Sequence, residues 1–345
     1  MAFVPPRAVT RWLYLVALVV ALMVTVGGFV RLTRSGLSIV EWKPISGVIP
    51  PIGEEAWQTE FAKYKLTPEY QKVNRGMSLA EYQRIFYLEY IHRLIGRVAG
   101  LLVVLPLFYF LWRGILPWRH AGVYLLIAAL FGFQAFLGWY MVSSGLIDRP
   151  RVDEFRLTAH LLTALTILAL ALWKALRGTR ALHVAGSVSP TARRLVLWLV
   201  ALVVLQIGYG GLVAGMRAGH ISDTWPLMFG RWIPAGLLAE APGGWANLFF
   251  NATTVHFVHR WFAFVVLIVA SALYFEAQRR RLDVGLQRAA LLVVGIILLQ
   301  ITLGVTVVLF GVPISLALWH QATAMLLFMA AIYALFLTRL TRPKP

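Results

Sequence analysis

Histidines inside long apolar segments are the residues of this sequence that could do chemistry. Residues 89–93 (EYIHR) have a counterpart in residues 256–260 (HFVHR), and an isolated histidine at 160 has a counterpart at 320. A histidine in hydrocarbon costs free energy, so its presence there indicates a function. The two matched pairs, which point to a metal ion or a metal-bearing cofactor, are His92 with His160 and His259 with His320.

Pairs of imidazoles suit one kind of centre better than others. Two histidines from facing helices of a bundle are typical axial ligands of a haem iron. A zinc or copper site is the rival, but zinc prefers three or four clustered ligands, commonly with cysteine or carboxylate. The chain contains no cysteine, which excludes disulfides, thiolate catalysis, iron–sulfur ligation and thioether attachment of haem.

Glu89 marks the sharpest difference between the two pairs. It precedes His92 by three residues and therefore shares its helix face, whereas the second pair has His256 at that place. A carboxylate beside a haem site can act as a general base, accept a proton or place a water molecule. The alternative is an ion pair with a nearby arginine. For His256 a hydrogen-bonding role is favoured over ligation.

Other polar groups near the histidines carry weaker signals. Arg93 and Arg260 follow the histidines directly and could contact haem propionates. Gln134 and Gln300 are expected to form polar contacts between helices. The glycines four residues after each glutamine, Gly138 and Gly304, are expected to be close-packing points between helices.

The elements that position these residues are membrane-spanning helices. The chain is 60% hydrophobic and 13% charged over 345 residues, with a mean hydropathy of +0.75. Apolar runs long enough to cross a bilayer recur throughout. The eight predicted spans are about 11–30, 85–111, 121–142, 155–175, 193–214, 253–276, 288–310 and 315–337. The fold class is therefore an all-α integral membrane protein.

Charge sets the predicted orientation. The net charge is +18, which in a soluble chain would suggest nucleic acid, but here lysine and arginine cluster at one end of the spans. An even number of helices places both termini on that side, which is predicted to be cytoplasmic. The first span lacks the features of a cleaved signal or transit peptide, which favours a bacterial inner membrane. The four histidines then lie toward the outer face.

The recurring motifs predict a duplicated four-helix unit. Residues 89–93 recur 167 positions later, and Gln134 and Gly138 recur 166 positions later. Parallel repeats of four helices, related by an axis along the membrane normal, would produce this order. The predicted division is an N-terminal half at 1–176, a cytoplasmic linker at 177–192 and a C-terminal half at 193–345.

The longest segment between spans, residues 31–84, is predicted to lie outside the cell. Ser78-x-x-Glu81 is a capping-box signature for the start of the second span. Trp57, Phe61 and Tyr64 have helical spacing, so part of this loop is expected to lie flat on the membrane surface.

These residues together resemble the haem A synthase family over nearly the whole chain. The resemblance rests on residues 27–38 (GGFVRLTRSGLS), 42–44 (WKP) and 89–97 (EYIHRLIGR), and on the His-Arg and His-Gln pairs of the sixth and eighth spans. The long first loop resembles the proteobacterial and mitochondrial branch. Some bacterial members carry a cysteine pair in the outer loops, and this chain has none.

The resemblance implies a reaction and a division of labour. Haem O would have its C8 methyl oxidised to a formyl group by successive hydroxylations, giving haem A for cytochrome c oxidase. The first half would hold haem O as substrate at His92, His160 and Glu89, and the second would hold a permanent haem b between His259 and His320. Haem O synthase, oxidase assembly factors and an unidentified electron donor or acceptor are candidate partners, and a homo-oligomer is left open.

Two other classes of protein use the same ligand pairs. A di-haem transmembrane cytochrome b would carry electrons from quinol without chemistry on the haem, and a haem transporter or chaperone would only move it. The carboxylate beside one pair alone, together with the motif-rich first loop, favours the enzyme.

Overall fold

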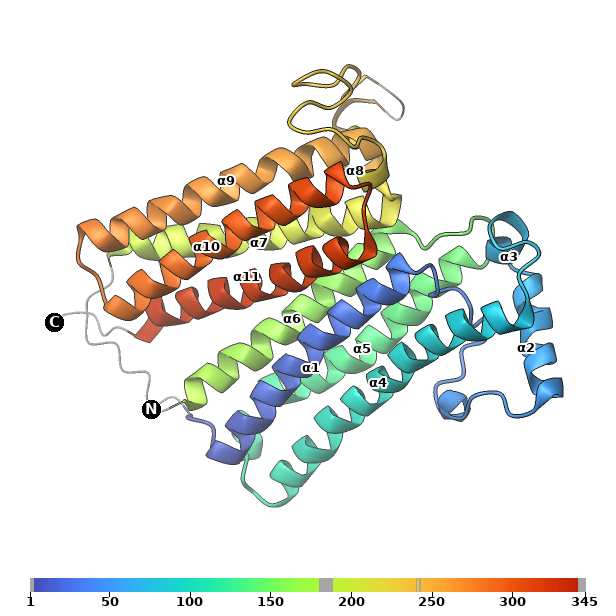
Figure 1. Cartoon of the computed structure of the whole chain (residues 1–345). Coiled ribbons are helices and arrows are strands. Elements are labelled where there is room, and N and C mark those ends of the chain that lie inside the picture. Colours follow the sequence, from blue (N-terminus) through green and yellow to red (C-terminus); the bar gives the residue numbers. More distant parts are fainter. Residues whose placement is uncertain (1–2, 180–188, 240, 242, 341–345) are drawn as a thin grey trace. The chain divides into compact units, whose positions relative to one another are not determined.

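Long helices account for most of the chain in the computed structural model, which describes residues 3–179, 189–239, 241 and 243–340 (Figure 1). Within these described residues, eight helices are long and apolar enough to cross a membrane. All eight predicted spans are confirmed in order and approximate extent. The helices are α1 (Arg7–Leu32), α4 (Leu79–Trp112), α5 (Gly122–Gly145), α6 (Glu154–Gly178), α7 (Pro190–Met216), α9 (Ala252–Arg279), α10 (Val284–Leu309) and α11 (Ile314–Leu340).

Capping side chains explain where several of these helices begin. The Ser78 hydroxyl accepts a hydrogen bond from the Glu81 backbone N–H, and the Glu81 carboxylate accepts one from the Ser78 N–H at 2.8 Å. The predicted capping box is therefore present at the start of α4. Ser189 and Asn251 cap α7 and α9 in the simpler one-sided way. These caps satisfy N–H groups that the first turn of a helix leaves without partners.

The chain divides into two compact units, one of residues 18–167 and the other of residues 1–17 and 168–345. In the second unit α7, α9, α10 and α11 pack as a closed set, with α7 beside α9, α9 beside α10, α10 beside α11 and α11 beside α7 (Figure 1). This is a four-helix bundle, in which side chains on facing helices meet in the core. In the first unit α4 packs beside α5.

The predicted arrangement as two parallel repeats, with halves at 1–176 and 193–345, stays a prediction. Most of the predicted linker at 177–192 lies outside the described residues, which stop at 179 and resume at 189.

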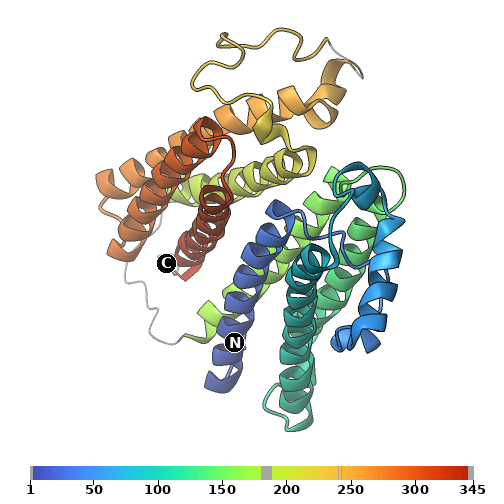
Figure 2. The ribbon, with the colours of Figure 1, turned by 45° about the vertical axis from the view of Figure 1, so that its right-hand side comes forward.

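The segment between α1 and α4, called the outer loop here after its predicted location, carries two short helices, α2 (Glu54–Lys65) and α3 (Pro68–Lys72). Trp57, Phe61 and Tyr64 of α2 are buried in one cluster with Tyr82 and Phe86 of α4. The aromatic side chains of α2 therefore cover α4, and the expectation that part of this loop lies flat on the membrane surface stays a prediction. Figure 2 shows α2 and α3 against the end of α4 from a second direction.

Candidate functional site

The histidine pair of the second unit lies in the core of its bundle. His259 on α9 and His320 on α11 have ring centres 6.4 Å apart, with the ring planes at 82°. The Nδ1 atom of each ring is buried and has no hydrogen-bond partner among the described residues. Imidazole binds metals at about 2.0–2.1 Å, so two rings on opposite sides of one metal have centres about 6.3 Å apart. The observed spacing therefore fits two axial ligands of a single iron.

Each of these rings packs against a glycine of the neighbouring helix. A Cβ added at Gly210 of α7 would lie 3.2 Å from Cε1 of His259, and one added at Gly304 of α10 would lie 3.2 Å from Cε1 of His320. A real side chain at either position would push on the ring. The glycines therefore leave the space in which the imidazoles sit, and the prediction that Gly304 is a close-packing point is confirmed.

The first unit has the same arrangement of ring and glycine. Cβ atoms added at Gly27 of α1 and Gly138 of α5 would lie 3.1 Å from Nε2 of His92 and 3.4 Å from Cε1 of His160. The Nδ1 atom of His160 is buried, and no residue in the described part of the chain hydrogen-bonds to it. All four predicted histidines thus have a ring packed against a glycine of a neighbouring helix, although His92 presents Nε2 to its glycine where the other three present Cε1.

Glutamine side chains hold the backbone at three of the four histidines. The Nε2 of Gln134 donates to the carbonyl oxygen of His160 at 2.9 Å, and Gln300 donates to that of His320 at 2.7 Å. Both glutamines were expected to bridge helices, and both do. Gln206 of α7 donates to the carbonyl of His259 at 2.9 Å in the same way. Sequence reasoning missed Gln206, although its spacing of four residues before Gly210 repeats that of Gln134 and Gly138.

Glu89 is buried, at 2% exposure, and its carboxylate is fully engaged. Oε2 accepts hydrogen bonds from the N–H and hydroxyl of Ser38, both at 2.8 Å, and from the N–H of Ile39 at 3.0 Å. Oε1 accepts from Nε and Nη2 of Arg93 at 3.0 and 2.6 Å. The ion pair considered from the sequence is present. The carboxylate also fastens the start of the outer loop to α4, a contact that the sequence did not reveal.

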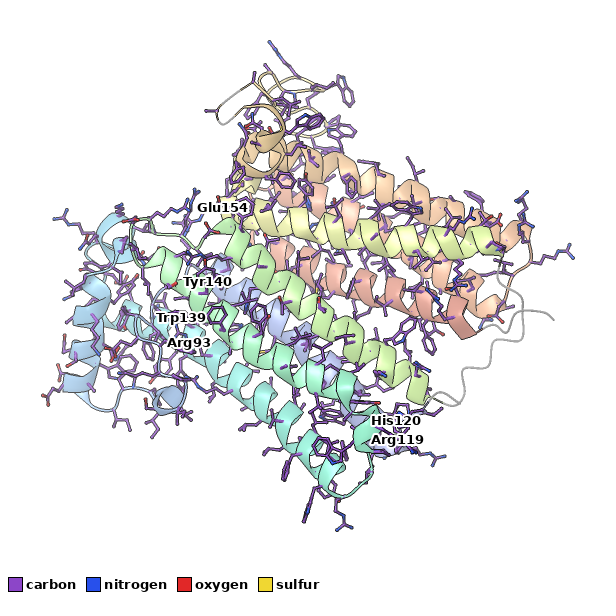
Figure 3. The ribbon with its side chains drawn as sticks, turned by 180° about the vertical axis from the view of Figure 1, so that it is seen from behind. Arg93, Arg119, His120, Trp139, Tyr140 and Glu154 are labelled. Carbon is purple, nitrogen blue, oxygen red and sulfur yellow. The ribbon has the colours of Figure 1, made fainter. Side chains whose placement is uncertain are left out.

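Arg93 extends the same attachment. Its Nη2 donates to the carbonyl of Ile39 at 3.0 Å and its Nη1 to that of Glu41 at 3.3 Å. Figure 3 shows Arg93 at the end of the unit near α2, with Arg119 and His120 at the opposite end. Arg93 therefore serves as a clamp on residues 39–41, and its predicted contact with a haem propionate stays a prediction.

The second unit uses the same clamp with a different partner. Nη1 and Nη2 of Arg260 donate to the carbonyls of Thr224 and Ser222, each at 2.9 Å, and Nε donates to Nε2 of His256 at 3.1 Å. His256 thus acts as a hydrogen-bond acceptor, in line with the role favoured from the sequence. The spacing of four residues in both pairs, 89 to 93 and 256 to 260, was the available signal.

Charged side chains of the outer loop form a network at the surface. Glu41 pairs with Lys43 and with Lys63 of α2, and Lys63 also pairs with Glu60 at 2.8 Å. Hydrogen bonds from Lys43 and Lys63 lower the pKa of Glu41. The hydrogen bond to Glu60 raises the pKa of Lys63 above its usual value. These groups are partly exposed, so the network is a weak fastening.

A cavity of about 550 Å³ lies beneath this loop, between residues 39–60 and α4. Arg93 and Arg97 line it together with apolar side chains that include Pro50, Phe86 and Tyr90, and its lining contains none of the four histidines. Arg97 also donates to the carbonyl of Pro44 at 2.9 Å. The candidate site is therefore defined by the arrangement of the four histidines, and this cavity is a separate feature.

Comparison with known proteins identifies close relatives over nearly the full length. A protein of Bradyrhizobium sp. (strain ORS 278) named "Heme A synthase" is 43% identical over 341 residues, covering 96% of this chain and 92% of that protein. Proteins of the same name from Chelativorans sp. (strain BNC1) and Brucella ovis are 45% and 43% identical, covering 91% and 94% of this chain and 86% and 90% of their own lengths.

The match to a family agrees with these relatives and with the fold. Residues 10–332 match COX15-CtaA, whose description is cytochrome oxidase assembly protein. The matched region contains all four histidines with their glycines and glutamines, and it spans all eight apolar helices. This chain is a multi-pass membrane protein that belongs to the COX15-CtaA family.

Proposed function

We propose that this protein makes haem A from haem O by oxidising the C8 methyl group to a formyl group through successive hydroxylations. The name shared by its relatives supports the overall conversion. The observation that carries the proposal is the presence of two matched histidine pairs, each ring packed against a glycine, in a member of this family.

We place a permanent haem b between His259 and His320. The 6.4 Å between the ring centres fits one iron, and the rings are held on packed helices of one bundle. A haem with two imidazole ligands has no open coordination position and supplies electron transfer when bound. The protein supplies the position of the rings and the enclosure of the site.

The first half would bind haem O as substrate through His92 and His160. Glu89 and Arg93 hold residues 38–41 of the outer loop against the turn of α4 that carries His92. The predicted role of Glu89 in moving protons competes with this anchoring role. The contacts support anchoring, because both carboxylate oxygens already accept hydrogen bonds.

We further propose that both termini are cytoplasmic and that the haem sites face the outer side. Lysine and arginine are enriched at the predicted inner ends of the spans, for example at Arg119. The histidines at 160, 259 and 320 each lie within about 10 Å of the opposite end of their helix, given a rise of 1.5 Å per residue. Haem O synthase, oxidase assembly factors and an electron carrier are the partners that this reaction implies.

A test of the function is to express the chain with a source of haem O and to chromatograph the extracted haems. Haem A or a hydroxylated intermediate is expected from the wild type, and its loss is expected in His92→Ala. His259→Ala should lose the absorbance of a low-spin haem with two histidine ligands in the purified protein. If only haem B is ever recovered, the chain is an electron carrier of the cytochrome b kind and the proposal fails.

A further inference from the structure

For three of the four histidines, the long helix that precedes the histidine in the chain carries the same small motif. A glutamine and, four residues later, a glycine face the histidine of the next long helix: the glutamine donates to its backbone carbonyl, and the glycine receives its ring. The sets are Gln134, Gly138 and His160; Gln206, Gly210 and His259; and Gln300, Gly304 and His320. This unit of two helices is finer than the predicted four-helix repeat.

The fourth histidine departs from the motif at one position. Gly27 of α1 receives the ring of His92, but four residues earlier stands Met23. A methionine side chain has no N–H group and cannot donate to the carbonyl of His92. Its terminal carbon lies 3.6 Å from the place where a Cβ on Gly96 would stand, one turn after His92. Met23 therefore packs against this turn of α4 without pinning its backbone.

The glutamine bond has a specific effect on a ligand. It fixes one point of the histidine's backbone to the neighbouring helix, at the level of the glycine that receives the ring. Gln134 and Gln206 make this hydrogen bond although the Oε1 atom of each is buried without a hydrogen-bond partner among the described residues. Burying an unpaired polar atom costs free energy. Methionine offers only adaptable apolar contact at the same position. His92 is thus the one ligand of the four whose backbone lacks this support.

We propose that Met23 makes the first-half haem exchangeable, and that Gln206 at the equivalent place retains the haem of the second half. This inference rests on the proposed function, in which the first half must accept a haem and release the product. A site that binds substrate needs a ligand able to move, whereas a permanent cofactor needs both ligands held. The side chain at this one position supplies the difference in backbone support, apart from the separate difference between Glu89 and His256.

The test is a reciprocal exchange in the full-length protein loaded with haem B. Transfer of haem to excess apomyoglobin is followed by absorbance and is expected to show a fast and a slow phase. Met23→Gln should slow the fast phase only, and Gln206→Met should speed the slow phase only. Hydrogen bonds between membrane helices predict about a threefold change in rate, and at most about fifteenfold.

Controls separate the hydrogen bond from packing. Met23→Leu keeps an apolar side chain of similar size, adds no donor and should leave both phases unchanged. An unchanged fast phase in folded Met23→Gln, or an equal slowing in Met23→Leu, would overturn the proposal. Folding of Met23→Gln is judged by its elution as a single species. If it does not elute in this way, the result for Gln206→Met alone decides. Because haem B is the probe, these results do not depend on whether the chain makes haem A.

Discussion

Replacing Glu89 by glutamine separates the two roles that this residue could have. The amide has the shape of the carboxylate but only one acceptor oxygen. If that oxygen serves Ser38 and Ile39, the amide NH₂ faces the guanidinium of Arg93, and if it serves Arg93, the NH₂ faces two backbone N–H groups. In either orientation buried donors lose their partner. We therefore expect the outer loop to detach from α4 more often.

The magnitude follows from the burial of the pair. Removing one partner of a buried ion pair costs about 3–5 kcal/mol. The side chain of Arg93 is 20% exposed and that of Glu89 is 3% exposed, so water relieves part of this loss. We expect about 2–4 kcal/mol, which corresponds to a roughly 30- to 700-fold larger population of the detached loop.

Amide hydrogen exchange at Ser38 and Ile39 measures the population of the detached loop directly, because the N–H groups of both residues donate hydrogen bonds to Glu89. Exchange there should accelerate by the factor given above, while the haem that we propose for the second half stays bound. Glu54→Gln is the matched control, since Glu54 is exposed on α2 in the same outer segment. It should change neither exchange nor haem content.

The same variant tests the alternative role. If exchange at Ser38 and Ile39 is unchanged in Glu89→Gln while formation of haem A stops, the carboxylate moves protons and the anchoring argument is refuted. If exchange accelerates and haem A formation falls with it, the anchored loop is what the reaction requires. A loss of one proton-transfer role alone commonly costs about 10²–10⁴-fold in rate.

Three further predictions address the glycine, the orientation and the surface charges. Gly304→Ala places a Cβ 3.2 Å from the His320 ring and should weaken haem binding roughly 5- to 100-fold in a haem titration. The control is Gly295→Ala on the same helix, whose Cβ would meet nothing within 4 Å and which should leave haem binding unchanged. Reporter fusions active only outside the cell should be silent at residue 119 and active at residue 60, and the reverse pattern would place the haem sites at the inner face. Hydrogen bonds from two lysines lower the pKa of Glu41 in the folded protein, so these contacts stabilise the loop fully above the unfolded pKa of 4.5 and lose this effect as the pH falls through the lower folded pKa. In the wild type, amide exchange in the loop, corrected for its intrinsic pH dependence, should rise over that pH range. In Glu41→Gln it should not rise.

Features that depend on neighbours in the sequence were predictable. The eight spans follow from the length and apolar content of each run, which a bilayer imposes on any helix that crosses it. The capping box at Ser78 and Glu81 joins residues three positions apart. The acceptor role of His256 toward Arg260 follows from a spacing of four. The two pairs lie within about one turn of a helix and the spans are continuous runs of sequence, so the local pattern alone contains these features.

The histidines were also evident from the sequence, for a different reason. An ionisable side chain in an apolar span needs a physical explanation, and four in two matched sets pointed to a metal ion or a metal-bearing cofactor, which stays a prediction. What the pattern could not supply was their spacing. The 6.4 Å between the rings of His259 and His320 depends on how α9 and α11 are rotated in the bundle. That rotation is set by packing along the whole helix.

The tertiary structure alone decided which partner each polar group takes. Glu89 could have faced the haem site or an arginine, and the outer loop, 51 positions earlier in the sequence, supplies its other partners. The apolar face of α2 could have met lipid, but α4 is nearer and aromatic, so the face packs there. Gln206 can donate to the backbone carbonyl of His259 only because α7 lies beside α9. Contacts between residues far apart in the sequence depend on which helix surfaces pack together, and the local sequence pattern does not determine that packing.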